Sequence, residues 1–301
     1  MNRFLTYTIE KEYQDKSVRQ FLRDVPRLSD KQIRSLKFRE NGILINGVKT
    51  RTSYMLKTGD VLRLQLEPAG QVSRHLLPLD VPLDILYEDE DVLAVNKPAG
   101  ILVHPSGGHF GDTLSNMAAA YFREKGEPTV IRSVGRLDKD TSGVLLFAKN
   151  KVTAAFLSSQ REQGGFRKEY LALVSGTPIP SRGEISLPLR LCAKSPLKMT
   201  ADPLAGKPAR TLYQTESVLR DGNALLKVHI LTGRTHQIRV HMASIGHPLL
   251  GDPLYGKKDG SPLSRTALHA ARLEFYRPFS QEQISIETPL PKDFQEYLSG
   301  Q

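Results

Sequence analysis

The chain has 301 residues, a formal net charge of +10, a pI of about 9.6 and a single cysteine. One cysteine excludes an intramolecular disulfide framework and a cysteine-rich zinc site, and no apolar run is long enough to cross a bilayer. We therefore expect a soluble, cytoplasmic protein with one large domain, or with a large and a small one.

The positive charge is concentrated at the N-terminal end. Residues 1–66 hold 14 Lys or Arg and 7 Asp or Glu, a local net charge of +7. Such a segment indicates either an anionic partner, most often nucleic acid, or a solvated basic surface without one. Charge alone does not choose between them.

The first 66 residues predict two short basic helices and a hairpin. In SVRQFLRDV and SDKQIRSLKFRENG, apolar residues that include Leu36 and Phe38 can face a core while Arg and Lys stay outside. ILINGVKT places Asn46 and Gly47 between two β-rich arms, which predicts a two-residue hairpin. LKTGDVLRLQL predicts a further turn and strand.

This order of helix, helix, ING hairpin and TGD turn resembles the S4 RNA-binding domain over residues 12–66. The resemblance implies that residues 1–66 form an RNA-binding domain. Residues 67–82 lose periodicity and carry three prolines, which predicts a linker. The basic residues of the two helices then become candidate RNA contacts, namely Arg19, Arg23, Lys31, Arg34 and Lys37.

The remaining residues, 83–301, mix short apolar runs such as DVLAVNKP and GVLLFAKN with helical stretches such as TLSNMAAAYFREKG. Strands and helices do not alternate regularly. This pattern predicts an α+β domain built on a mixed, largely antiparallel sheet with flanking helices, rather than a doubly wound one.

The stretch GRLDKDTSG holds two carboxylates, Asp138 and Asp140, among turn formers and directly before the apolar VLLFA. A turn that enters a buried strand is the ordinary interpretation. D-x-D-x-T is also the motif of aspartyl-nucleophile phosphatases, but there the apolar strand precedes the first Asp. Here RSVGRL precedes it, and no Gly-rich phosphate loop accompanies it, so the turn is favoured.

A second informative stretch is LTGRTHQIRVHMASIGHPLLGDPLYG. Thr235 is predicted to cap a helix that runs to about Ile245. Arg234 would then lie at the positive end of the helix, where a cation is unfavourable unless an anion neutralises it. A buried Asp is one candidate partner, and an exposed arginine without a partner is the alternative. The three histidines of the stretch lack the spacing of a metal site, so no metal is expected.

Together, NKPAGILVHPSGG, GRLDKDTSGVLLFAKN, RKEYLALVSG, KMTADPLAGKPARTLYQ and TGRTHQIRVHMASIGHPLLGDPLYG resemble the RluA-type family of RNA pseudouridine synthases over essentially the whole chain. R-L-D-x-x-T-S-G followed by T-G-R-T-H-Q-I-R is a highly specific pair of motifs. The resemblance implies a catalytic domain with a central cleft, which isomerises specific uridines in structured RNA. It also implies RNA as the partner, ribosomal RNA before transfer RNA, a monomer, and no cofactor or metal.

The resemblance assigns roles to three residues. Asp138 is the nucleophile, attacking the target uridine at C1′ of the ribose or at C6 of the base, while Asp140 serves the turn. Arg234 pairs with Asp138 and keeps it ionised. Tyr170 packs against the target base and assists proton removal from C5.

Further positions are assigned to RNA contact. Arg136 fills the gap left by the flipped uridine, and Lys97 and Lys168 contact RNA. Many family members have His where this chain has Gly135, which leaves contacts near that position open. A non-enzymatic alternative is an inactive RNA-binding or ribosome-assembly factor, which predicts damage to the catalytic residues. The sequence shows none.

Overall fold

The computed structural model describes residues 4–66, 73, 76–127, 130–256, 261–280 and 282–301. These residues form a four-stranded sheet, a ten-stranded sheet and a two-stranded hairpin. Only the last part of the predicted linker, together with residue 73, falls within the described residues.

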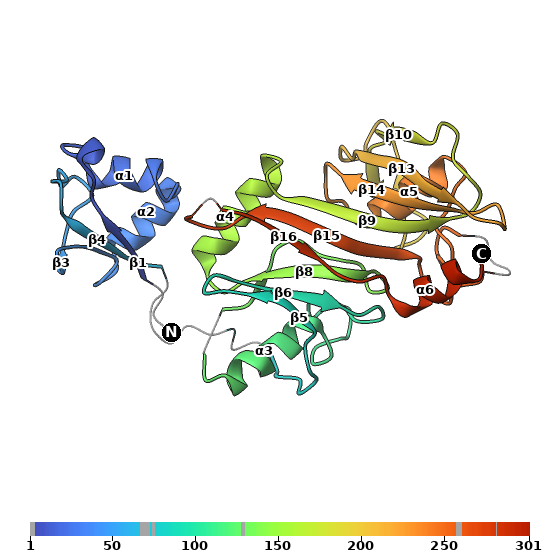
Figure 1. Cartoon of the computed structure of the whole chain (residues 1–301), viewed down its shortest axis with the longest axis horizontal. Coiled ribbons are helices and arrows are strands. Elements are labelled where there is room, and N and C mark those ends of the chain that lie inside the picture. The colour runs from blue at the N-terminus through green and yellow to red at the C-terminus, as the bar shows by residue number, and fades with distance from the viewer. Residues whose placement is uncertain (1–3, 67–72, 74–75, 128–129, 257–260, 281) are drawn as a thin grey trace.

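Residues 4–66 form a small module in which two helices pack on the four-stranded sheet (Figure 1, blue). Across the sheet the strands are β1 (Phe4–Thr8), β4 (Val61–Gln65), β2 (Ile43–Ile45) and β3 (Val48–Lys49). The two helices are α1 (Val18–Asp24) and α2 (Asp30–Lys37), and the short 3₁₀ helix η1 (Lys11–Tyr13) precedes them.

Both α-helices of this module begin at a capping box. The side chains of Ser17 and Ser29 accept the backbone N–H of Gln20 and Gln32, whose side-chain oxygens accept the serine backbone N–H in return. The predicted core position of Phe38 was wrong, because its side chain is 76% exposed. It lies two residues beyond the buried Leu36, about 200° around a helix and thus off the apolar face.

The predicted hairpin is confirmed. Asn46 and Gly47 have φ angles of 52° and 83°, as a type I′ turn requires. The Asn46 side chain donates to Asp60 at 2.9 Å and accepts the backbone N–H of Val61 at 2.8 Å, which fastens the turn to β4.

The ten-stranded sheet forms the body of the molecule (Figure 1). Its main order is β10 (Arg182–Ile185), β13 (Thr211–Val218), β14 (Ala224–Ile230), β9 (Arg167–Val174), β15 (Leu268–Tyr276), β8 (Ser142–Ala148), β6 (Val92–Lys97) and β5 (Ile85–Glu88), with β16 (Gln283–Glu287) on β15 and β7 (Arg132–Ser133) on β8. Among the described pairings β15 with β8 is parallel and the others are antiparallel. The predicted α+β class with a largely antiparallel sheet is confirmed.

Strand β8 is buried along its whole length because helices cover both of its faces. Leu145 and Phe147 join an apolar cluster with α3 (Leu114–Glu124) and α5 (Gln237–Ser244). Val144 and Leu146 point the other way, into a cluster that includes α4 (Lys151–Glu162). This two-sided burial explains the uninterrupted apolar run VLLFA after the aspartate motif.

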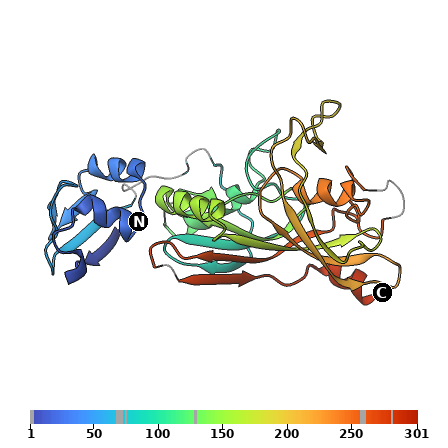
Figure 2. The ribbon, with the colours of Figure 1, turned by 90° about the horizontal axis from the view of Figure 1, so that it is seen from above.

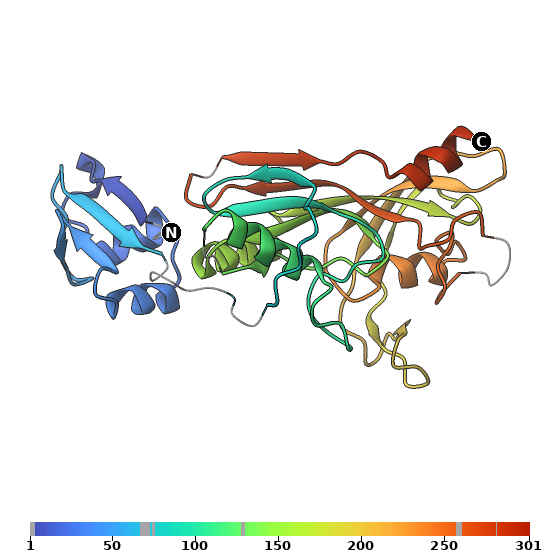
Figure 3. The ribbon, with the colours of Figure 1, turned by 90° about the horizontal axis from the view of Figure 1, so that it is seen from below.

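Two further elements complete the body. The hairpin of β11 (Leu189–Leu191) and β12 (Met199–Ala201) belongs to a segment that projects from the sheet (Figures 2 and 3, yellow). The C-terminal helix α6 (Lys292–Ser299) buries Phe294. Within the described residues no helix is long and apolar enough to cross a membrane.

The small module lies at one end of the molecule and meets the body at the start of α4 (Figures 1 and 2). Val152 of α4 packs into the core of the module, and its carbonyl accepts Nε2 of Gln32 at 3.4 Å.

Candidate active site

Asp138 lies on the loop between β7 and β8. The neighbouring Leu137 is buried in the main apolar cluster and anchors the loop, while the Asp138 side chain is 18% exposed. The N–H of Thr141 donates to the Asp138 carbonyl at 3.2 Å, closing a turn before the strand begins at Ser142. The turn predicted for this stretch is therefore present. Its aspartate precedes the buried strand, opposite to the phosphatase arrangement.

The glycine of the motif is fixed by the parallel neighbour strand. Gly143 has a φ of 111°, and a Cβ at this position would lie 2.2 Å from the carbonyl oxygen of Ala270 on β15. No other residue fits that approach without moving the strand. The close contact sets the start of β8, and hence the position of Asp138 five residues earlier.

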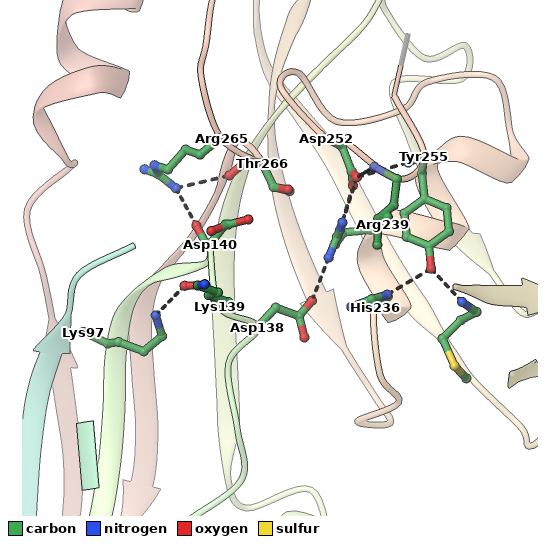
Figure 4. Close-up of polar contacts among 12 residues, drawn as sticks. Lys97, Asp138, Lys139, Asp140, His236, Arg239, Asp252, Tyr255, Arg265 and Thr266 are labelled. Atoms are coloured by element: carbon green, nitrogen blue, oxygen red, sulfur yellow. Dashed lines mark hydrogen bonds and ion pairs between the residues drawn. The ribbon is translucent and has the colours of Figure 1, made fainter. Parts of the chain in front are cut away.

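Two cationic side chains hold the loop through its backbone (Figure 4). Nζ of Lys97 donates to the carbonyls of Pro98 and Lys139 at 2.7 and 2.9 Å. Nη1 of Arg265 donates to the carbonyl of Asp140 at 3.0 Å, and its other nitrogens bind Asp293 of α6. The backbone of Lys139 and Asp140, directly after Asp138, is thus held by two side chains from other parts of the chain.

The prediction that Lys97 contacts RNA was wrong. Its side chain is 0% exposed, because β6 carries it into the interior behind the Asp138 loop. Burial lowers its pKa to about 7, although the charges of Asp140 and Asp138 oppose that shift. Lys97 thus supports the loop from inside.

We expect Lys97→Met to change how stability depends on pH. An unfolded lysine titrates near pH 10.4, so between about pH 7 and 10 the unfolded chain binds more protons than the folded one at this group. The unfolding free energy of the wild type should therefore rise with pH relative to the variant, by up to about 1.4 kcal/mol per pH unit. Denaturant titrations of both proteins at several pH values measure the difference. A constant difference would contradict a lowered pKa.

Arg239 of α5 is the cation beside Asp138. Its Nη1 lies 3.6 Å from Oδ2 of Asp138 (Figure 4). Its Nε and Nη2 bind the two carboxylate oxygens of Asp252 at 2.7 and 2.8 Å. The guanidinium also lies over the ring of Tyr255, 5.2 Å from the centroid. Because Asp252 binds two nitrogens of the buried guanidinium, the third nitrogen, Nη1, is held facing Asp138.

The charges of this pair persist in the interior. Burial is the largest single effect and disfavours the charged form of both side chains, but their hydrogen bonds and the attraction between their charges together outweigh it, so the pKa of Arg239 is raised and that of Asp252 is lowered. The Asp252 side chain is 0% exposed, and its Oδ1 also accepts the N–H groups of Leu254 and Tyr255. Asp252 therefore orients the arginine that faces Asp138.

The predicted pairing of Arg234 with Asp138 was wrong. Arg234 is exposed, and its Nε donates to the carbonyl of Pro208 at 2.9 Å. The helix also begins later than predicted: Gln237 is its first residue, and His236, rather than Thr235, precedes it. His236 adopts a left-handed conformation (φ 54°, ψ 21°), which turns the chain sharply between the two arginines of the motif.

Gln237 shapes this turn, a role that the sequence did not reveal. Its side chain is 3% exposed, and its oxygen accepts the Thr232 hydroxyl and the Arg234 N–H at 2.8 and 3.0 Å. Its nitrogen donates to the Arg210 carbonyl and to the Thr211 hydroxyl. A fully satisfied buried amide of this kind fixes the loop that enters α5.

Tyr170 lies on β9 and is 4% exposed, within the same apolar cluster as Leu137. Burial raises its pKa well above the usual range, and the negative charge of Asp138 raises it further. The ring is therefore a neutral phenol near the carboxylate. A phenolate that takes the C5 proton is disfavoured. The predicted packing of the ring against a base stays a prediction, which requires the base to reach a ring that is almost fully buried in this structure.

The other predicted RNA contacts of the body differ in exposure. Arg136 is exposed beside Asp138, as a contact requires. Lys168 is 8% exposed, so the predicted contact through its side chain is not supported; burial, and then the nearby Arg161, lower its pKa to about 8. Arg161 also lies next to Gly135, 3.4 Å from where a Cβ would stand. A side chain at position 135, where many family members have His, would therefore lie beside Arg161.

All the predicted contacts of the module are exposed, namely Arg19, Arg23, Lys31, Arg34 and Lys37. The first two donate to Asp30 across the two helices, at 2.9 and 2.6 Å. These bonds, that of Arg23 before that of Arg19, lower the pKa of Asp30 to about 2. Lys37 lies over the exposed ring of Phe38, 5.7 Å from its centroid.

A second buried carboxylate, Asp91, has a different setting. It is 3% exposed and accepts the side chains of Asn150 and Thr153 at the start of α4. It therefore fastens a helix rather than facing solvent. Across the described ranges, no group of three or more His, Cys, Asp or Glu residues is arranged to hold a metal ion.

The sequence and the fold both match known proteins. The profile of the RNA pseudouridylate synthase family matches residues 91–244, a range that contains Asp138, Tyr170 and Arg239. An uncharacterized RNA pseudouridine synthase of Bacillus subtilis, YjbO, is 36% identical over 274 residues, 91% of this chain and 95% of the relative. Ribosomal large subunit pseudouridine synthase D of Zymomonas mobilis is 40% identical over 73% of each chain.

Among solved structures, the human RNA pseudouridylate synthase domain containing 1 superimposes with a TM-score of 0.58 and 31% identity, covering 70% of this chain and 84% of that one. Fold, motifs and relatives agree on an isomerase that acts on RNA. The chain belongs to the family of RNA pseudouridine synthases.

Proposed function

We propose that this enzyme converts uridine to pseudouridine in ribosomal RNA of the large subunit, with Asp138 as its nucleophile. The observation that carries the role of Asp138 is its geometry: a partly exposed carboxylate stands 3.6 Å from a buried arginine that Asp252 holds in place. The choice of ribosomal RNA rests on relatives such as the Zymomonas mobilis synthase, whose name specifies the large ribosomal subunit.

The proposed reaction is an isomerisation in which Asp138 attacks the flipped uridine, at C1′ of the ribose or at C6 of the base. The N1–C1′ bond breaks, uracil rotates, a C5–C1′ bond forms, and the bond between Asp138 and the uridine breaks, which restores the free carboxylate. C5 then loses its proton and N1 gains one, so atoms balance without a cofactor. Arg239 places a positive charge beside the carboxylate and orients it, Tyr170 packs against the base, and Arg136 fills the vacated stack.

Arg234 has no place in this proposal. Its catalytic assignment depended on a contact with Asp138 that Arg239 makes instead. Its exposed guanidinium remains available for an RNA phosphate.

The test is a pseudouridine map of ribosomal and transfer RNA from cells that lack the gene. We expect the loss of one or a few pseudouridines in large-subunit RNA, restored by the wild-type protein and not by Asp138→Asn. Losses confined to transfer RNA would overturn the proposed substrate and leave the enzyme class intact. Restoration by Asp138→Asn would overturn the nucleophile.

We further propose that the small module anchors RNA through its basic helix α2. Arg34 and Lys37 are exposed beside Phe38, whose ring can stack on an unpaired base. Contacts to phosphates release counterions, so affinity depends on salt.

We expect Arg34→Gln with Lys37→Gln to weaken RNA binding and to reduce the slope of log affinity against log salt by about 0.7 to 0.9 for each phosphate that the variant no longer neutralises. The rate at saturating RNA should not change. Binding titrations at several salt concentrations measure the slope. Lys292→Gln, which removes a cation that is 89% exposed on α6, is the control. Equal slopes in wild type and double variant would exclude the module helix as an anchor.

A further inference from the structure

His236 occupies a conformation that costs free energy. Its φ of 54° places a non-glycine residue in the left-handed region immediately before α5. Such strain is maintained when surrounding contacts require it, and it occurs preferentially at functional sites. Here the turn directs the imidazole toward the Asp138 site.

The ring nitrogen Nδ1 is already used. It lies 2.9 Å from the hydroxyl of Tyr255, which also accepts the backbone N–H of Met199 at 2.7 Å. With one side of the hydroxyl oxygen taken by that N–H, its own proton is free to point at Nδ1. This arrangement allows Nδ1 to accept that proton, and the proton of a neutral imidazole then lies on Nε2, which is the tautomer that the proposal requires.

The other edge of the ring faces the catalytic carboxylate. The imidazole lies between the Tyr255 hydroxyl and the Asp138 side chain (Figure 4). Burial lowers the pKa of His236; Asp138 and Asp252 act against this shift, whereas Arg239 and Arg136 add to it. The ring is therefore a neutral donor within the electrostatic reach of the residues around Asp138.

We propose that His236 contacts the substrate, donating its Nε2–H to a carbonyl oxygen of the target uracil. The inference rests on the proposed function, because it places the target base beside Asp138. Uracil offers two acceptor oxygens, O2 and O4, and a neutral N–H donor matches a carbonyl. An exposed guanidinium such as that of Arg234 is better suited to the charged phosphate. Tyr255 acts as a positioning residue that fixes the tautomer.

Two substitutions separate the ring from the backbone. His236→Asn keeps a residue that tolerates the left-handed conformation and can still reach Tyr255, but it lacks the Nε2 donor. We expect single-turnover kcat/KM to fall about 5- to 10-fold, the size of one hydrogen bond. His236→Gln places an amide N–H near the Nε2 position, so it should recover part of this loss despite a less favourable backbone.

A thermodynamic cycle identifies the acceptor. RNA with 2-thiouridine or 4-thiouridine at the target position carries sulfur, a weaker acceptor, in place of O2 or O4. One of the two should slow the wild type and have little further effect on His236→Asn, since the hydrogen bond is already absent. A structural role predicts the same slowing by sulfur in both proteins, and that result would overturn the contact.

Two further results would overturn the proposal. A reduced salt slope in His236→Asn, without coupling to either sulfur, would assign the histidine to a phosphate. Nitrogen NMR resonances that place the proton on Nδ1 would remove the donor. Asp138→Asn, assayed in parallel, separates the proposed nucleophile from the proposed histidine contact. If Asp138→Asn is inactive while His236→Asn matches the wild type, only the histidine contact is wrong. An active Asp138→Asn would overturn the assignment of the nucleophile.

Discussion

Asp138→Asn is expected to abolish pseudouridine formation while leaving RNA binding and folding nearly intact. An amide has almost the same shape as the carboxylate but is not a nucleophile, and loss of a nucleophile costs on the order of 10⁴- to 10⁶-fold in rate. The side chain is partly exposed, and asparagine has nearly the same volume, so we expect little loss of stability. Tritium release from RNA with 5-tritiated uridine measures turnover, and a binding titration measures affinity.

Asp140→Asn is the matched control, two residues along the same loop. Its carboxylate supports the buried charge of Lys97, while its backbone carbonyl, which Arg265 binds, is unaffected by the substitution. We expect substantial activity to remain. Equal losses in the two variants would mean that the loop, rather than one carboxylate, limits the reaction, and the assignment of Asp138 would fail.

Local patterns predicted much of the fold. The Asn46-Gly47 hairpin and the helices α1 and α2 follow from turn chemistry and apolar periodicity, and the structure contains all three. The buried strand β8 was evident from VLLFA. These features depend on neighbours within a few residues, which a sequence displays directly.

The site depended on longer-range geometry. Arg234 and Arg239 stand five residues apart in one motif, and the left-handed turn at His236 decides which of them faces Asp138. Propensity does not predict that turn, because the buried amide of Gln237 enforces it through contacts with β13 and the loop before α5. The five-residue spacing between the two arginines does not indicate which of them faces Asp138.

The sequence also did not indicate which basic side chains are buried. Lys97 ends a strand and resembles any basic residue near a nucleic-acid site, yet its ammonium binds carbonyls of its own chain, one of them 42 residues away. Asp252, 13 residues beyond Arg239, gave no sign that it holds a guanidinium. Both partners become visible only when the sheet brings the loops together.

Arg239→Ala is expected to have the second large effect, on activity and on stability together. It leaves the Asp252 carboxylate buried without its cation, which costs about 3 to 5 kcal/mol. It also removes the positive charge 3.6 Å from Asp138, which should lower the single-turnover rate by about 100-fold or more. Arg239→Lys should recover only part of either quantity, because an ammonium cannot make the two-pronged contact with Asp252 and face Asp138 as well.

Stability and catalysis can be separated at this pair. Arg239→Met with Asp252→Asn removes both charges, and the asparagine oxygen can still accept the N–H groups of Leu254 and Tyr255. We expect this double variant to regain much of the unfolding free energy lost in Arg239→Ala, because no unpaired charge stays buried, and yet to remain slow. Arg234→Ala, at an exposed position, should change stability by less than about 0.5 kcal/mol and spare the rate at saturating RNA. Denaturant unfolding and single-turnover assays on the wild type, Arg239→Ala, the double variant and Arg234→Ala test these expectations. Recovery of both rate and stability in the double variant would mean that Arg239 has only a structural role. A slow Arg234→Ala beside an active Arg239→Ala would mean that Arg234, and not Arg239, pairs with Asp138.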